Sequence, residues 1–239
     1  MRILLGLVCI AYIAALHIVA ALALLRPDLI DAQRWRTPWL ETEPSVYVTQ
    51  SHRLFRAIDA DAEAGRLLLI GDSQMQRLDS APLNRPAYNF AAGGDTMEHI
   101  GRRIADYRQP RTARAVVLWA GVNDLLRGRE PEAVRAAFER AERAIPADRP
   151  LWLISIAPVA ARPARPDLQA RIARTNALLA EACRARCRFV DLTARFAGED
   201  GALRPSYDSG DGLHLNRAGH AVVSAAINTL SGAAAETAR

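Results

Sequence analysis

The sequence contains no lysine, so all 31 of its basic side chains are arginine, against 26 acidic side chains. The formal net charge is +5, but the basic and acidic residues are interspersed rather than gathered in runs. This pattern does not indicate a nucleic-acid-binding protein. Internal repeats are also missing, and 50% of the 239 residues are apolar, which is enough for one sizeable core and too little for two ordinary domains.

Cysteine is scarce as well, with three in the chain. No second pair of Cys or His residues stands at metal-ligand spacing, so the sequence does not indicate a zinc site. Cys183 and Cys187 lie close together, near the expected end of a helix and the start of a strand. In an exported domain they could form a disulfide. Otherwise they would be two half-buried thiols, and the sequence leaves both alternatives open.

The longest apolar run is at the N-terminus, where residues 3–25 are apolar apart from His17. A helix of this length would cross the roughly 30 Å hydrocarbon layer of a membrane, because each residue adds about 1.5 Å. We therefore predict that residues 1–25 form a transmembrane anchor, or a signal segment cleaved near Ala21-Leu22-Ala23. The rest of the chain would then face the periplasm or the exterior, and it would be secreted if the segment is removed.

Residues 26–64 are predicted to form a connector, because their first half is rich in proline, tryptophan and charge without a sustained period. Within this region, apolar residues at helical spacing predict a helix over Ser51–Gly65. A single domain is predicted over residues 65–232, and the alanine-rich residues 233–239 are predicted to be a disordered tail.

Short apolar runs alternate with amphipathic segments in the predicted domain. The runs are RLLLIG, AYNFA, AVVLWAG, LWLISIAP and RFVDLT, and the main amphipathic segments are Met97–Tyr107, Pro131–Ile145, Asp167–Cys183 and Arg217–Leu230. Continuous apolar runs are typical of strands that are buried on both faces of a parallel sheet. The alternation predicts an α/β fold with a doubly wound, flavodoxin-like, five-stranded parallel sheet between two helical layers, a three-layer α/β/α arrangement.

Four polar, turn-forming clusters lie where these strands end or before the last helix. They are GDSQ at 71–74, AAGGDT at 91–96, GVND at 121–124 and DSGDGLHLN at 208–216. Each cluster alone could be a turn or a helix cap. In a parallel sheet, however, the first three would share the edge at which binding sites form.

Together the clusters contain the parts of a nucleophilic site. A serine hydroxyl attacks effectively only when an oriented base removes its proton. Asp211 and His214 offer an orienting group and a base in one loop. The developing oxyanion needs donors that are fixed before reaction. The backbone at Gly94, the amide of Asn123 and the N–H of Ser73 could supply them.

In order and spacing, the four blocks resemble those of the SGNH (GDSL-type) hydrolases, and the resemblance covers nearly the whole predicted domain. It implies an SGNH-hydrolase fold with Ser73 as nucleophile, His214 as base and Asp211 as the partner of the base. It also implies an oxyanion hole formed by Ser73, Gly94 and Asn123, with neither a metal nor a cofactor.

Some details depart from the family pattern or leave alternatives. The first block reads GDSQ where many members have GDSL or GDSI, which leaves the nucleophile intact. Gly94 fits the family spacing better than the adjacent Gly93. Asp208 is an alternative to Asp211, although a three-residue step from Asp to His is the family pattern. The G-x-S-x-G elbow of α/β-hydrolases is absent.

We therefore predict a serine esterase that hydrolyses O-acyl esters, in particular acetyl esters, of a carbohydrate or lipid through an acyl-enzyme. One alternative is an O-acyltransferase on the same scaffold that moves an acyl group to or from a cell-envelope glycan. Another is a noncatalytic module that binds a glycan. The expected partners are a small ester or an acylated glycan or lipid, and a membrane through residues 3–25, without nucleic acid. The sequence leaves the oligomeric state open.

Overall fold

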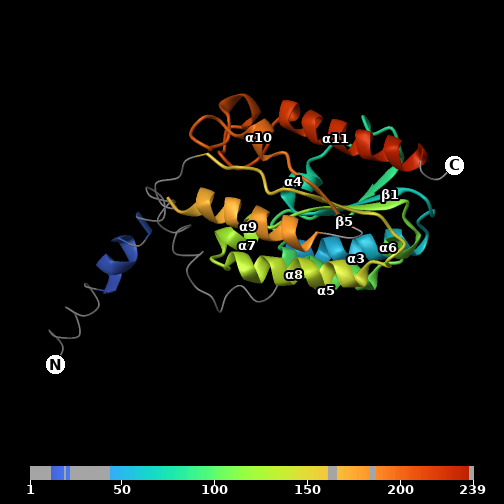
Figure 1. Ribbon diagram of the computed structural model, residues 1–239. Helices are drawn as coiled ribbons and strands as arrows, with labels where there is room; N and C mark the ends of the chain where they lie inside the picture. The colour runs from blue at the N-terminus through green and yellow to red at the C-terminus, as the bar shows by residue number, and fades with distance from the viewer. Residues whose placement is uncertain (1–11, 19, 22–43, 161–165, 184–186, 237–239) are drawn as a thin grey trace. The chain divides into compact units, whose positions relative to one another are not determined.

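The computed structural model describes residues 12–18, 20–21, 44–160, 166–183 and 187–236 (Figure 1). The chain divides into two compact units, Met1–Thr42 and Glu43–Arg239. In the first unit, the described residues are helical. Most of the predicted membrane segment lies outside the described residues, as does the connector as far as residue 43. Within the described ranges, no helix combines the length and the apolar character that a membrane span requires.

The second unit contains one sheet of five parallel strands in the order β2-β1-β3-β4-β5. The strands are β1 (Leu67–Gly71), β2 (Ala87–Asn89), β3 (Ala115–Trp119), β4 (Leu151–Ile154) and β5 (Cys187–Val190). Each strand falls within or next to one of the predicted apolar runs. The chain first adds β2 on one side of β1 and then builds outward on the other side, which is the doubly wound order. The predicted five-stranded parallel sheet is confirmed.

Both faces of this sheet are buried, which explains why the strand sequences do not alternate with polar residues. Successive side chains of a strand point to opposite faces. Accordingly, Leu68 and Ile70 of β1 lie in one hydrophobic core, and Leu67 and Leu69 lie in the other. All four are 0% exposed.

Helices cover the two faces of the sheet (Figure 1). The helices are α3 (Val46–Ala60), α4 (Ser73–Gln76), α5 (Met97–Arg103), α6 (Gln109–Thr112), α7 (Val122–Leu126), α8 (Pro131–Ala144), α9 (Leu168–Ala182), α10 (Thr193–Phe196) and α11 (Arg217–Glu236), with short 3₁₀ turns η2 (Ile104–Asp106) and η3 (Pro205–Tyr207). Helices α3, α5, α8 and α9 cover one face, where Phe55 and Phe138 join the first core. Helices α4, α10 and α11 cover the other, where Met75 and Ile227 join the second core. The predicted three-layer arrangement is therefore observed.

Helix α3 differs from the sequence-based expectation in position and in packing. It begins at Val46 rather than at Ser51, because the hydroxyl of Ser45 accepts a hydrogen bond from the N–H of Val48 and caps the helix. Val48 and Phe55 are buried in the first core. Helix α3 belongs to the compact unit that begins at Glu43.

Two other predicted helices also end at different residues. The segment predicted as one helix over Met97–Tyr107 is α-helical only to Arg103 and continues as the 3₁₀ turn η2. The last helix, α11, continues to Glu236, beyond Leu230, where the predicted amphipathic segment ends. The remainder of the predicted tail lies outside the described residues.

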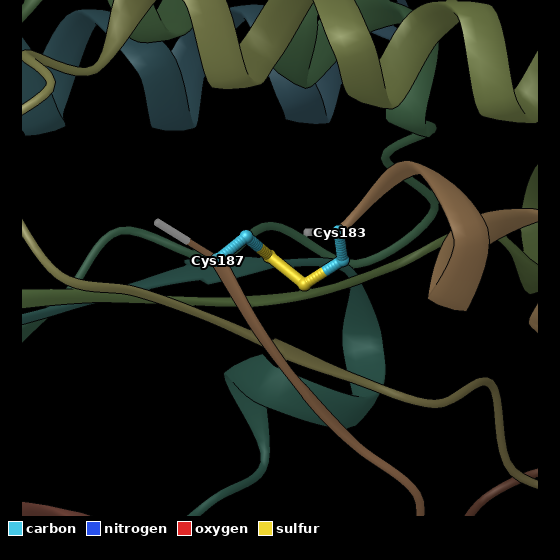
Figure 2. The surroundings of a disulfide bond; sticks show 2 residues. All are labelled: Cys183 and Cys187. Carbon is cyan, nitrogen blue, oxygen red and sulfur yellow. A yellow bond between two sulfur atoms is a disulfide. The ribbon is translucent and has the colours of Figure 1, made fainter. Parts of the chain in front are cut away.

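A disulfide joins Cys183 to Cys187 (Figure 2). Cys183 caps the C-terminus of α9, and Cys187 is the first residue of β5. Their Cα atoms lie 4.8 Å apart, within the range that a disulfide spans. Of the two alternatives that the sequence left open, the structure has the bridge.

Candidate active site

The first block places Ser73 at the edge of the sheet where β1 ends. Gly71 pairs with Trp119 of the neighbouring strand, and a Cβ atom at Gly71 would collide with the carbonyl oxygen of Trp119. Glycine is therefore required at this close approach. Asp72 then caps α4, because its Oδ1 accepts a hydrogen bond from the N–H of Gln74 (2.9 Å). Ser73 is consequently the first residue of the helix.

Ser73 and the loop at 208–216, here called the base loop, meet at this edge. The Oγ of Ser73 lies 2.8 Å from Nε2 of His214, a residue 141 positions away in the sequence. On the other side of the ring, His214 Nδ1 lies 2.6 Å from Oδ2 of Asp211. The three predicted triad residues thus form one continuous chain of hydrogen bonds.

The carboxylate of Asp211 has a second set of partners within the base loop. Its Oδ1 accepts hydrogen bonds from the backbone N–H groups of Leu213 (2.9 Å) and His214 (2.8 Å). Partial burial raises the pKa of Asp211, but the hydrogen bonds from His214 and Leu213 outweigh it and hold this pKa well below its ordinary value. An ionised Asp211 accepts a hydrogen bond from Nδ1–H of His214, so Nε2 carries no proton and faces Ser73 as an acceptor.

The alternative orienting residue, Asp208, has a different position. Its Oδ1 accepts hydrogen bonds from the backbone N–H groups of Gly210 and Gly212, both at 2.9 Å. Asp208 therefore shapes the turn of the base loop. The carboxylate that contacts the ring of His214 is that of Asp211.

The second block together with Met97, the first residue of α5, is here called the glycine loop (residues 91–97), and it lies next to Ser73. A Cβ atom placed on Gly93 would be 3.8 Å from Cβ of Ser73. Gly94 has a φ of +78°, a conformation that side chains disfavour. The amide Nδ2 of Asn123 donates to the carbonyl of Asp95 (2.9 Å). Asn123 is therefore hydrogen-bonded to the residue that follows Gly94.

Comparison with known proteins agrees with this geometry. Residues 70–222 match the GDSL-like lipase/acylhydrolase family, and this stretch contains every residue of the site described above. The chain belongs to this family.

Several known proteins resemble this chain in sequence or in fold. The platelet-activating factor acetylhydrolase IB subunit alpha1 of Pongo abelii is 28% identical over 189 residues, which are 75% of this chain and 80% of the relative. A GDSL-like lipase of Bacteroides thetaiotaomicron has a similar fold, with a TM-score of 0.63 at 20% identity over 78% of this chain and 98% of the other. A carbohydrate esterase family 3 structure from Talaromyces cellulolyticus has a TM-score of 0.54 at 16% identity, over 72% and 99%.

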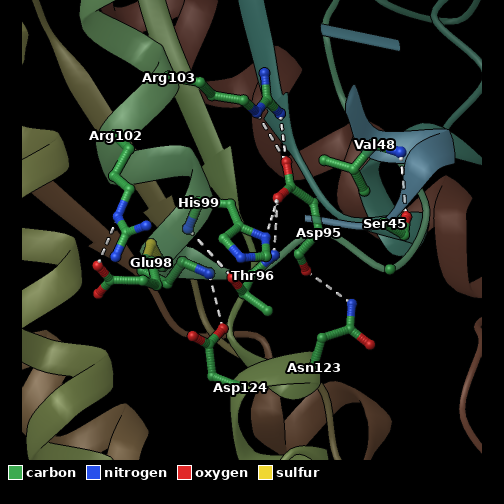
Figure 3. Close-up of polar contacts among 12 residues, drawn as sticks. Ser45, Val48, Asp95, Thr96, Glu98, His99, Arg102, Arg103, Asn123 and Asp124 are labelled. Carbon is green, nitrogen blue, oxygen red and sulfur yellow. Dashed lines mark hydrogen bonds and ion pairs between the residues drawn. The ribbon is translucent and has the colours of Figure 1, made fainter. Parts of the chain in front are cut away.

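In this GDSL-like hydrolase, two buried carboxylates make polar contacts within and next to the glycine loop (Figure 3). Asp95 is 0% exposed, and its Oδ2 lies 2.8 Å from the guanidinium of Arg103, which is 5% exposed. Asp124 is also fully buried; its Oδ2 accepts from the N–H of Met97 (2.7 Å), and its Oδ1 pairs with Arg129 (3.1 Å). The carboxylate of Asp124 therefore bonds the first residue of α5.

Burial shifts the pKa of two carboxyl groups close to Ser73. Burial raises the pKa of Asp72 to about 7; the N–H of Gln74 lowers it, and nearby Asp95 and Asp124 raise it further. Burial also raises the pKa of Asp124, and the N–H of Met97 offsets this only in part. Within the described ranges, no cluster of His, Cys, Asp and Glu residues is arranged to hold a metal ion.

Sequence reasoning assigned no role to the two glutamines of α4. Oε1 of Gln76 accepts a hydrogen bond from the N–H of Gly93 (2.8 Å), and its Nε2 bonds the hydroxyl of Tyr47 on α3. Gln74 contacts the base loop instead. The signal that could have found Gln74 is a polar amide directly after the serine, where the family often has an apolar residue.

Proposed function

We propose that this GDSL-like hydrolase is a serine esterase that removes small acyl groups, in particular acetyl, from a carbohydrate or lipid through an acyl-enzyme. The observation that carries the proposal is the chain of hydrogen bonds from Ser73 Oγ to His214 to Asp211. It has the order nucleophile, base, orienting carboxylate that serine acyl transfer requires.

The reaction follows from these contacts. His214 Nε2 takes the proton of the Ser73 hydroxyl as Oγ attacks the ester carbonyl, and ionised Asp211 stabilises the resulting imidazolium. The imidazolium then gives its proton to the leaving alkoxide, and the C–O ester bond breaks. A water molecule, deprotonated by the same ring, attacks the acyl-serine and releases the acid and the free serine.

Three donors are assigned to the oxyanion. The N–H of Ser73 lies in the first turn of α4, where backbone N–H groups lack helical partners. The N–H of Gly94 belongs to the glycine loop beside Ser73. The amide of Asn123 uses one hydrogen for the carbonyl of Asp95, and an amide NH₂ group has a second to offer.

The choice of a small acyl group on a polar substrate rests on the relatives and on one cleft. The curated relative is named an acetylhydrolase, and one structural neighbour is named a carbohydrate esterase. A cleft of about 680 Å³ borders the base loop at Leu215 and Asn216, and its other walls include Arg77, Arg217 and His220. The polar side chains of these walls can hydrogen-bond a hydroxylated leaving group.

The first experiment compares hydrolysis of p-nitrophenyl acetate by the full-length protein and its Ser73→Ala variant. Because the nucleophile is lost, we expect kcat to fall by about 10⁴-fold or more. Ser80→Ala is the matched control, because Ser80 is an exposed serine that, like Ser73, lies between β1 and β2. Equal rates for the wild type and Ser73→Ala would overturn the assignment of Ser73.

A second experiment separates hydrolysis from transfer to an acceptor. We expect acetylated sugars to release acetate at a rate that does not depend on an added sugar acceptor. Acetyl consumption that requires the acceptor, with the acyl group recovered on it, would make the enzyme an O-acyltransferase instead.

We also propose that the catalytic domain lies in an oxidising compartment, anchored through residues 3–25. The disulfide between Cys183 and Cys187 supports this location, because disulfides persist in the periplasm and outside the cell. A protease-protection assay on intact cells and spheroplasts tests it. We expect the domain to be digested in spheroplasts, and protection in both would contradict the proposal.

A further inference from the structure

A buried side-chain amide joins α4 to the base loop. Gln74 is 4% exposed. Its Nε2 donates to the carbonyl of Leu213 (2.7 Å), and its Oε1 accepts from the N–H of Leu215 (3.1 Å). These two residues stand on either side of His214 in the chain. We propose that Gln74 is a positioning residue that holds His214 within hydrogen-bonding distance of Ser73; this rests on the proposed function of both.

The two hydrogen bonds require an amide. One contact needs a donor and the other an acceptor, and an amide group carries both on atoms joined to the same carbon. An ionised glutamate has no donor, and leucine, isoleucine or methionine has neither group. By binding the peptide groups before and after His214, Gln74 fixes the backbone from which the ring extends.

The other hydrogen bonds of the base loop do not reach α4. Asp208 and Asp211 bond backbone N–H groups within the loop itself. The carbonyl of Gly212 accepts from the N–H of Ala160, which follows β4 (2.8 Å). Among the described residues, the bonds of Gln74 are those that tie the base loop to α4 besides the Ser73–His214 contact itself.

Ser73 and Gln74 are consecutive residues, and this adjacency makes the link effective. One short helix then carries both the nucleophile and the group that places its base. A shift of α4 relative to the base loop is opposed by two buried hydrogen bonds next to the reacting pair. We therefore attribute the Ser73–His214 distance of 2.8 Å to the two hydrogen bonds of the neighbouring Gln74.

The test uses full-length protein with Gln74→Met, made both alone and together with His214→Ala. The matched control is Gln109→Met, which also removes a fully buried amide. Gln109 donates to the carbonyl of Glu63 (3.0 Å), which precedes β1, whereas Ser73 follows it. The measurements are kcat and KM for p-nitrophenyl acetate and the midpoint of thermal unfolding.

We expect Gln74→Met to lower kcat about 10- to 100-fold, because displacement of a catalytic group by about 1 Å can cost 100-fold. KM should stay unchanged, since the buried amide does not reach the substrate. In the His214→Ala background, Gln74→Met should cost no further activity. Gln109→Met should lower the unfolding midpoint and leave kcat unchanged. If Gln74→Met does not fold, Gln74→Glu, which keeps the size and the acceptor, replaces it with the same expectations.

Two results would overturn the positioning role. One is an unchanged kcat in the folded Gln74 variant. The other is an equal loss of activity with and without His214, which would mean that Gln74 acts on the structure in general. If His214→Ala alone leaves kcat unchanged, the proposed function fails, and the positioning role falls with it. That case is recognised from His214→Ala alone.

Discussion

The base loop and the glycine loop meet at Ser73, but they are held in different ways. The base loop is shaped by hydrogen bonds between residues close in sequence, and its key carboxylate, Asp211, has a side chain that is 46% exposed. The glycine loop rests on Asp95, which is 0% exposed and paired with the buried Arg103. The carboxylate of the base loop therefore has its hydrogen-bond partners close in sequence, whereas that of the glycine loop depends on the packed interior.

This difference predicts that removing a carboxylate affects catalysis in one loop and stability in the other. Removing the carboxylate of Asp211 should abolish catalysis in a folded protein, because this side chain is about half exposed. A change beneath the glycine loop should weaken the fold, because it leaves a buried charge without its partner.

The largest effect is expected from Asp211→Asn. An asparagine keeps an acceptor for the loop N–H groups, but it no longer holds His214 in the required tautomer, so kcat should fall about 10⁴-fold. The unfolding midpoint should change little. Steady-state kinetics and thermal unfolding measure the two quantities, with Asp191→Asn, an exposed turn residue, as control. A large loss of stability would show that the base loop is not independent of the core.

Asp95→Ala should have the next largest effect, now on stability. Removing one partner of a buried ion pair costs about 3–5 kcal/mol, because the charge of Arg103 stays buried. Urea unfolding of the variant measures the cost. Asp106→Ala, whose side chain is 50% exposed, should change the free energy of unfolding by less than about 1 kcal/mol. If the two variants were equally stable, the proposed contrast between the loops would be wrong.

Asp72 should make the stability of the protein depend on pH. Its pKa of about 7 in the folded protein lies above the unfolded value, so the folded state keeps the carboxyl proton up to a higher pH than the unfolded state does. The free energy of unfolding should therefore fall as the pH rises from about 4 to 7, by about 2–4 kcal/mol for this group. Asp72→Asn keeps the acceptor for Gln74 and should flatten this dependence. Identical pH profiles for the two proteins would contradict the raised pKa.

The smallest effect is expected from the disulfide, which belongs to neither loop. Replacing Cys183 and Cys187 together by serine should lower the free energy of unfolding by about 2 kcal/mol, because the loop that the bridge closes is short. The value of kcat should not change. Urea unfolding and steady-state kinetics measure the two quantities, and a loss of activity in the folded variant would contradict this prediction.

Much of the fold could be predicted because the strand signal is local. Runs such as that around Leu67 and Ile70 are apolar without alternation, and burial on both faces requires this pattern. The bounds of α3 could not be predicted in the same way. Its start depends on the Ser45 cap, and its place in the domain depends on contacts of Phe55 with distant residues.

Site residues could likewise be predicted only where their partners are close in sequence. Asp211 and His214 were predictable as a pair, because they lie three residues apart in one turn. The partner of Asp95 was not predictable from its loop, because Arg103 comes from the far end of α5. The role of Gln74 was not predictable either, since its partners lie more than 130 residues along the chain.

By itself, the sequence determined the family, the order of the strands along the chain, the residues at the strand ends and the expected nucleophile, base and orienting acid. These features depend on residue type and short-range spacing. Only the tertiary structure decided that Cys183 and Cys187 are bridged, that Asp95 and Asp124 support the glycine loop, and that Gln74 binds the base loop. Contacts of this kind depend on which surfaces meet when the helices pack on the sheet, and no local pattern specifies that.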